Sequence, residues 1–183
     1  MPYTYKWPMA APCSAILIYT RSGSELTLLT THRAPAVGVG RCLSAGGFYE
    51  VKDMFNTAGK MQDGRAETYR EMVEELGEQI NTIIPYEVFA GRVRHLWDGM
   101  VTSDDPAIIY NGTFRTLEVS AAEMAAIMAL PPTEEQIGKT LEVFQIDSST
   151  DDELIARRLA DFKYGHEVEA AKMWYAQMAR APG

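Results

Sequence analysis

The chain has 183 residues, 46% hydrophobic and 23% charged, which is the balance of a globular protein long enough to bury a core. Its formal net charge of -8 repels phosphate backbones and excludes a protein that coats nucleic acid. The N-terminus lacks a signal pattern, no apolar run is long enough to span a membrane, and the two cysteines have neither metal-binding nor disulfide spacing, so we expect a cytoplasmic protein.

The first elements of the chain are predicted to be β-strands. Residues 13–22 and 25–33 are apolar and rich in β-forming side chains, and the Gly23-Ser24 pair between them predicts a hairpin turn. Residues 34–47 are rich in glycine and alanine and have no helical period, which indicates a loop with room for one short strand.

The strongest helix signal lies at residues 63–80. Asp63 is the predicted N-cap, and Gly77 is the predicted residue at the C-terminal end. The apolar residues recur at helical spacing and form one stripe, made of Ala66, Tyr69, Met72, Val73 and Leu76. This stripe predicts a helix that packs one face against a sheet.

The rest of the chain alternates strands and helices. The patterns predict strands at 86–97 and 107–119 around a polar loop at 98–106, a helix at 120–130 capped by Ser120, a loop at 131–138, a strand at 139–147 and two helical segments broken near Gly165. This order predicts an α/β fold with a mixed sheet between helices. We expect one domain over residues 1–183, with its core at about 13–147 and C-terminal helices at 150–180.

Four glutamates share one face of the predicted helix. Because an α-helix turns by about 100° per residue, Glu67, Glu71, Glu74 and Glu75 fall within an arc of about 100°, away from the apolar stripe. Like charges at these spacings destabilise a helix by roughly 0.2–0.5 kcal/mol per pair, and Arg70 is the one cation among them. The face is therefore either a solvated acidic surface or a site for hard divalent cations such as Mg²⁺ or Mn²⁺.

The stretch REMVEELG, residues 70–77, resembles the core of the Nudix box, whose pattern is G-x5-E-x7-R-E-U-x-E-E-x-G-U with U a bulky aliphatic residue. The matching residues are Arg70, Glu71, Met72, Glu74, Glu75 and Gly77. The Gly46-Gly47 pair ahead of the helix is similar to the glycine turn of that family. Together with the hairpin before it and the strands after it, the resemblance covers roughly residues 13–147.

The chain departs from the Nudix pattern upstream of the helix. Strict spacing requires a glutamate and a glycine where the sequence has Gln62 and Asn56. Counted forward from the glycine pair, the acid falls at Asp53, which implies extra residues in the loop at 54–63. In the family the upstream acid pairs with the arginine of the box, and either Asp53 or Asp63 could do so here.

The resemblance implies a Nudix-like α/β/α sandwich and an enzyme. Nudix enzymes use divalent cations to hydrolyse a nucleoside diphosphate linked to another group. The match implies that Glu71, Glu74, Glu75 and the carbonyl of Gly46 are ligands of Mg²⁺ or Mn²⁺. It also implies catalytic roles for Glu71 and Glu74, with one glutamate as the base, and an orienting role for Arg70.

Many members of the family take a further carboxylate from a loop before a late strand. In this chain Glu134 and Glu135 lie in such a loop. The resemblance makes Glu134 or Glu135 a candidate base or extra metal ligand, and two solvated loop glutamates are the alternative.

Contacts to the substrate are less strongly indicated. Tyr49, Trp97 and Tyr110 are candidates to stack on a nucleobase, although each residue type is also common in cores. Arg33 and Arg41 flank the glycine-rich loop, where they could hold a phosphate. The partner implied by the resemblance is a small nucleoside diphosphate derivative, and a homodimer is compatible with the family.

Three functions are open at this point. The first is a metal-dependent pyrophosphohydrolase, which the presence of Glu71, Glu74 and Glu75 favours. The second is a Nudix-like module that binds a nucleotide without cleaving it, which the lengthened loop favours. The third is an unrelated α/β domain whose acidic helix face is only solvated.

Overall fold

A computed structural model of the protein describes residues 9–33, 40–43, 45–49, 63–102, 108–134 and 139–180. The elements of its first half are β1 (Met9–Ser22), β2 (Glu25–Arg33), β3 (Gly40–Leu43), β4 (Ala45–Phe48), α2 (Arg65–Leu76), α3 (Ile80–Ile83) and α4 (Tyr86–Arg92). Those of its second half are β5 (Arg94–Thr102), β6 (Ile108–Glu118), α5 (Ala121–Met128), β7 (Lys139–Asp147), α6 (Asp152–Leu159) and α7 (Gly165–Arg180). Within the described ranges, none of the helices is both long and apolar enough to cross a membrane.

The strands form one mixed sheet. Its order is β3-β2-β1-β6-β5, with β4 paired to β1 and β7 paired to β2. β1 and β6 run parallel up to Tyr19 and Glu118, and the other pairs are antiparallel. β1 changes partner along its length, because residues 13–16 pair with β4 and residues 19–22 pair with β2. The sheet therefore forks in the middle of β1.

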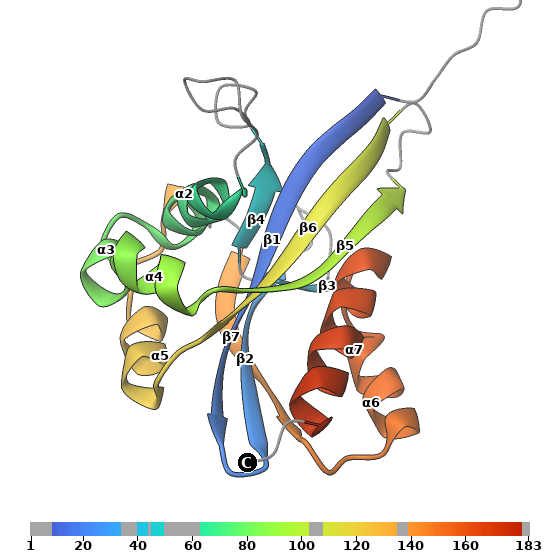
Figure 1. The fold of residues 1–183 in the computed structure, drawn as a ribbon. Coiled ribbons are helices and arrows are strands. Elements are labelled where there is room, and N and C mark those ends of the chain that lie inside the picture. Colours follow the sequence, from blue (N-terminus) through green and yellow to red (C-terminus); the bar gives the residue numbers. More distant parts are fainter. Residues whose placement is uncertain are drawn as a thin grey trace, which may run out of the picture.

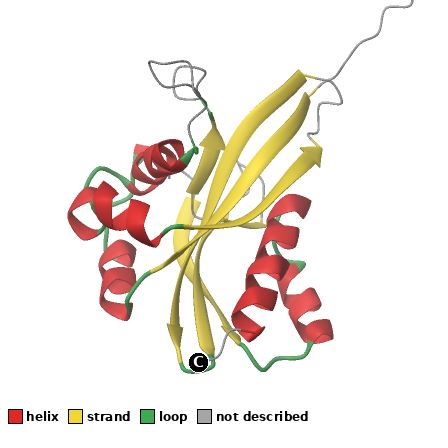
Figure 2. Ribbon diagram, viewed as in Figure 1, coloured by secondary structure: helices red, strands yellow, loops and turns green. Residues whose placement is uncertain are grey.

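Helices cover both faces of this sheet. In Figure 1 and Figure 2, α2 to α5 lie on one side of the strands and α6 and α7 on the other. Alternating side chains of β1 supply both cores, because Ile16 and Ile18 pack with α2 to α5 while Leu17 and Tyr19 pack with α6 and α7. The predicted α/β/α sandwich with a mixed sheet is confirmed.

The predicted strand at 86–97 is wrong over its first half. That half forms the helix α4, and β5 follows it and extends into the segment predicted as a loop at 98–106. The aromatic residues favoured a strand, but Phe89 and Val93 are four residues apart and are both buried. Burial at that spacing is typical of one face of a helix.

Helix α2 is shorter than the predicted span of 63–80, and glycines flank it at both ends. Gly64 has a φ of 72° and takes the N-cap position expected for Asp63, whose Oδ1 accepts a hydrogen bond from the Arg65 N–H at 3.0 Å. The helix ends at Gly77, with a φ of 89°, as predicted. Both φ values lie in the left-handed region that favours glycine.

Most of the other predicted helices and strands are confirmed. The hairpin of β1 and β2, the strand β6 and the strand at 139–147 lie where the sequence places them. Helix α5 begins after Ser120, whose side chain forms a capping box with Glu123. The tail holds two helices, the second of which starts at Gly165. The predicted loop at 34–47 contains two short strands, β3 and β4, rather than one.

Candidate active site

The glutamates of α2 do not form a uniformly exposed surface. Glu67 and Glu71 are only 3% and 8% exposed, whereas half of the Glu74 side chain is exposed. The burial arises because β4 packs against α2. A solvated acidic surface, the simpler interpretation of the sequence, therefore does not describe Glu67 and Glu71. Ala66, assigned to the apolar stripe, is exposed instead.

Arg70 binds three of these carboxylates at once. Its guanidinium forms ion pairs with Glu67, Glu71 and Glu74. The Arg70 Nη2 atom lies 2.5 Å from Glu71 Oε1 and donates to the carbonyl of Phe48, on β4, at 3.2 Å. Arg70 therefore joins α2 to β4 and contacts three carboxylates, and its orienting role in catalysis stays a prediction.

Of the two upstream acids considered from the sequence, Asp63 lies at Arg65 and not at Arg70. Asp63 pairs with Arg65, whose Nη2 lies 2.5 Å from Asp63 Oδ2, and this hydrogen bonding holds the pKa of Asp63 below its usual value. Glu67 binds Arg70 instead, from one turn earlier in α2. Asp53 and the inserted loop up to residue 62 lie outside the described residues.

Glu71 lies against the glycine pair of β4. A Cβ atom on Gly47 would lie 2.0 Å from Glu71 Oε2, so only glycine leaves room for the carboxylate. Burial raises the pKa of Glu71 to about 7; Arg70 opposes this rise, and Glu74 adds to it. Removal from water is thus the main reason why Glu71 ionises less readily than an exposed glutamate.

Glu75 is bound to a different cation. Lys139 Nζ, at the start of β7, lies 2.9 Å from both carboxylate oxygens of Glu75. The two side chains are only 14% and 17% exposed. All three glutamates of the box are therefore paired with cations of the protein itself.

The donor chemistry of the site fits Mg²⁺ or Mn²⁺. Carboxylate oxygens on α2 and backbone carbonyls on β4 are the hard oxygen ligands that these ions prefer. The Glu71 carboxylate occupies the space that a side chain on Gly47 would fill, so it lies directly against the backbone of β4. Among the described residues, no three acidic, histidine or cysteine side chains converge as a metal site; Arg70 is bound to Glu71 and Glu74, and Lys139 is bound to Glu75.

A groove of about 970 Å³ opens beside these residues. Its lining includes Glu75, Lys139 and the Gly46-Gly47 pair, together with residues 163–167 at the start of α7. This volume is within the range of pockets that take small-molecule ligands.

Aromatic rings line the same groove. The ring of Phe48, which is 54% exposed, lies 5.1 Å from the ring of Tyr110, measured between centroids. Trp97 stacks on Phe114 with centroids 5.2 Å apart. All four residues are part of the lining, so the groove offers flat apolar surfaces to a planar ligand.

Buried polar groups complete the lining. Ser14 is 3% exposed, and its hydroxyl has no hydrogen-bond partner within the described part of the chain. Glu167 is 7% exposed, and its Oε1 accepts a hydrogen bond from the Leu43 N–H at 3.1 Å. Burial lowers the pKa of His166 and raises that of Cys13 to about 11, so both are neutral at pH 7. Flat apolar surfaces with a few buried polar groups are typical of ligand sites.

The structure brings some of the predicted substrate contacts to the groove and not others. Trp97 and Tyr110 line it. Arg41 does not, because its side chain pairs with Glu142 at 3.0 Å and lies over the Phe144 ring.

Other predicted site residues also lie apart from the groove lining. Tyr49 is at the N-terminal end of α2, where its Oη would lie 2.2 Å from a Cβ atom on Gly64. Glu134 is exposed and does not line the groove. Glu135 and the side chain of Arg33 lie outside the described residues, so their roles stay predictions.

The sequence did not indicate two of the groove residues. Phe48 follows the glycine pair directly, which is a signal that could have been used. Lys139 has no such signal, because only the fold brings the first residue of β7 next to the end of α2.

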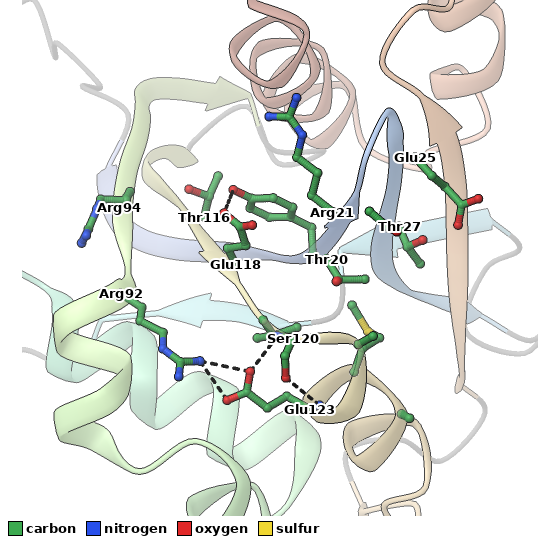
Figure 3. Close-up of a pocket in the computed structure, with 16 residues that line it drawn as sticks. Thr20, Arg21, Glu25, Thr27, Arg92, Arg94, Thr116, Glu118, Ser120 and Glu123 are labelled. Carbon is green, nitrogen blue, oxygen red and sulfur yellow. Dashed lines mark hydrogen bonds and ion pairs between the residues drawn. The ribbon is translucent and has the colours of Figure 1, made fainter. Parts of the chain in front are cut away.

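A second groove, of about 920 Å³, lies at the C-terminal ends of β1 and β6. Three arginines line it, but Figure 3 shows Arg21, Arg92 and Arg94 pointing in different directions. The carboxylate of Glu123 binds Arg92 at 2.8 Å. No glutamate of α2 lines this groove, so the candidate active site is the first one.

Three solved structures resemble the chain over nearly its whole length. The Nudix domain of NrtR from Shewanella oneidensis, crystallised with ADP-ribose, has a TM-score of 0.54 and 12% identity, covering 94% of this chain and 90% of its own. A Nudix hydrolase from Nitrosomonas europaea has a TM-score of 0.53 and 11% identity, covering 93% and 91%. An Ap4A hydrolase of C. elegans, in a binary complex, has a TM-score of 0.51 and 8% identity, covering 92% and 98%.

No protein-family model matches the sequence, and no curated protein matches it. Structural similarity at identities of 8% to 12% shows the fold and does not show the activity. The chain has the fold of the Nudix hydrolases.

Proposed function

We propose that this protein hydrolyses a phosphoanhydride bond in a nucleoside diphosphate linked to another group, with Mg²⁺ or Mn²⁺ as cofactor. The observation that carries the proposal is that Glu71, Glu74 and Glu75 lie together on α2, and that Glu75 and the Gly47 backbone beside Glu71 line a groove with aromatic walls. The Nudix fold supports it. So do two similar structures, one of an Ap4A hydrolase and one that contains ADP-ribose.

The charge of the site supports a metal cofactor. An acidic protein needs cations to bind a phosphate substrate, and oxygen donors from Glu71, Glu74, Glu75 and the Gly46 carbonyl would hold them. When bound, Mg²⁺ or Mn²⁺ neutralises phosphate oxygens and lowers the pKa of a coordinated water.

The residues of the chain orient the reacting groups. In the hydrolysis, a water oxygen forms a bond to phosphorus, the bond from phosphorus to the leaving phosphate oxygen breaks, and a water proton passes to a carboxylate base. Glu71 and Glu74 are the candidate bases on α2, and Glu135 is the candidate from the loop before β7. Arg70 fixes the first two through its guanidinium.

The aromatic part of the groove is suited to the nucleoside. The exposed ring of Phe48 and the neighbouring ring of Tyr110 can cover one face of a base. Lys163, whose Nζ lies 5.0 Å from the centroid of the Tyr164 ring, adds positive charge to the same groove. A substrate that joins a base to a diphosphate would therefore extend from the aromatic walls toward α2.

The test is a hydrolysis assay with and without Mg²⁺ or Mn²⁺, on nucleoside triphosphates, ADP-ribose, NADH, dinucleoside polyphosphates and nucleotide sugars. We expect metal-dependent turnover in the wild type and a loss of about 10²-fold or more in Glu74→Gln, whose exposed side chain can be changed with little effect on folding. Glu78→Gln is the control. Glu78 is exposed just beyond α2, and its replacement removes the same single charge as Glu74→Gln. Equal turnover in the two variants would contradict the assignment of the site.

A second candidate is a nucleotide sensor of the same fold. The pairing of Glu71 and Glu74 with Arg70, and of Glu75 with Lys139, favours it, because these carboxylates are already neutralised in part. A sensor would show no turnover on any compound but would gain thermal stability from one of them.

A further inference from the structure

The ion pair between Glu75 and Lys139 differs from the other ion pairs of the acidic cluster. Arg70 lies on α2 itself, three residues from Glu67 and four from Glu74, so helix geometry alone accounts for those two ion pairs. Lys139 lies 64 residues beyond Glu75 and reaches it from β7. The fold thus brings the first residue of β7 close enough to α2 for its ammonium group to bind the last glutamate of the box.

The geometry of this pair is that of a specific contact. Lys139 Nζ lies 2.9 Å from each oxygen of Glu75, and both side chains are mostly shielded from water. A shielded pair is stronger than an exposed one, because water and salt screen it less. Both residues also line the groove that holds the candidate site.

We propose that Lys139 is a built-in competitor for the metal, an ammonium group that holds the Glu75 carboxylate until a divalent cation displaces it. The inference rests on the proposed function, since it assumes that Glu75 is a metal ligand. An ammonium group on both oxygens of Glu75 repels a divalent cation that approaches the same carboxylate, so the two cations compete for Glu75.

The exchange has a consequence for the substrate. The released ammonium group stays in the groove, because Lys139 is anchored in β7, where it pairs with Arg33 of β2. It then lies where a phosphate group approaches the acidic cluster. In this proposal, metal binding at Glu75 frees the Lys139 ammonium group, which then helps to position the phosphate of the substrate.

The test measures Mn²⁺ binding to the full chain by the loss of the free-ion signal in electron paramagnetic resonance. We expect Lys139→Met, which keeps the length of the side chain and removes its charge, to bind Mn²⁺ about three- to tenfold more tightly than the wild type. Lys139→Arg keeps a cation and should restore the wild-type affinity. In a Glu75→Gln background, Lys139→Met should leave Mn²⁺ affinity unchanged.

The control is Lys172→Met. Lys172 pairs with Glu169 at 2.8 Å near the same groove, and its loss changes the net charge by the same amount. Mn²⁺ affinity should rise in Lys139→Met and not in this control. If the wild type binds Mn²⁺ and Lys139→Met binds it no more tightly, the competition proposed for Lys139 is wrong. That result would not contradict the proposed metal site. If neither protein binds Mn²⁺, the proposed function fails, and the role of Lys139 fails with it.

Discussion

Replacing Gly47 with alanine tests the contact between the glycine pair and α2. The added Cβ would lie 2.0 Å from Glu71 Oε2, 2.4 Å from Cδ and 2.8 Å from Oε1. Ordinary contacts between heavy atoms begin at about 3.5 Å, so the carboxylate would have to retreat by more than about 1 Å. It cannot do so freely, because Glu71 is buried and bound to Arg70.

The expected cost of Gly47→Ala is that of overpacking, about 1–3 kcal/mol of the free energy of unfolding. For a domain of this size that loss corresponds to a fall of about 3–9 °C in Tm. Thermal unfolding followed by circular dichroism measures it. The Mn²⁺-induced rise in Tm should also shrink, because the displaced carboxylate is one of the proposed ligands.

Gly91→Ala is the matched control for Gly47→Ala. A Cβ on Gly91, in helix α4, meets no atom within 4 Å, so alanine should stabilise the protein by about 0.5–1 kcal/mol through its higher helix propensity. If Gly47→Ala unfolds at the wild-type temperature and keeps the full response to Mn²⁺, Glu71 does not lie against β4 as described.

Three further predictions concern the scaffold. Trp174→Ala should lower the free energy of unfolding by about 3–5 kcal/mol in urea titrations, because Trp174 is fully buried between α7 and the sheet. Ser120→Ala should cost about 1 kcal/mol in the same assay through loss of the capping box, and a cost near zero would contradict the cap. Burial lowers the pKa of His166 in the folded state, so its contribution to stability is present above pH 6.5 and is lost as the pH falls below that value. His166→Phe should remove this part of the pH dependence, and an unchanged profile between pH 7 and 5 would show that His166 is not responsible.

Elements with a strong local signal could be predicted from the sequence. The hairpin of β1 and β2 follows from two β-rich runs around a short turn, and α5 follows from Ser120 at its cap. Helix α4 could not be predicted in this way, because its aromatic residues have a high preference for strands. The contact of Phe89 with Tyr69 of α2 in the core favours the helix over a strand, and this contact cannot be seen in the sequence.

In the candidate site, too, local features could be predicted from the sequence and long-range contacts could not. The spacing of Glu71, Glu74 and Glu75 places them on one face of a helix, and that face could be predicted from the sequence. The position of Glu67 on the same face was also predicted, but its burial was not, because burial depends on β4. Lys139 reaches the cluster through long-range packing, which periodicity along the chain cannot show.

The charges of the cluster connect these observations. The four carboxylates of α2 face two cations, Arg70 and Lys139, so the cluster keeps two negative charges when all four are ionised. Burial and its acidic neighbours raise the pKa of Glu71 to about 7, which means that a proton offsets part of that excess at neutral pH. A divalent cation that binds as proposed would supply the two positive charges that the cluster lacks and would displace the ammonium group from Glu75. The repulsion between the glutamates, costly to an isolated helix, would then be relieved by the bound cation.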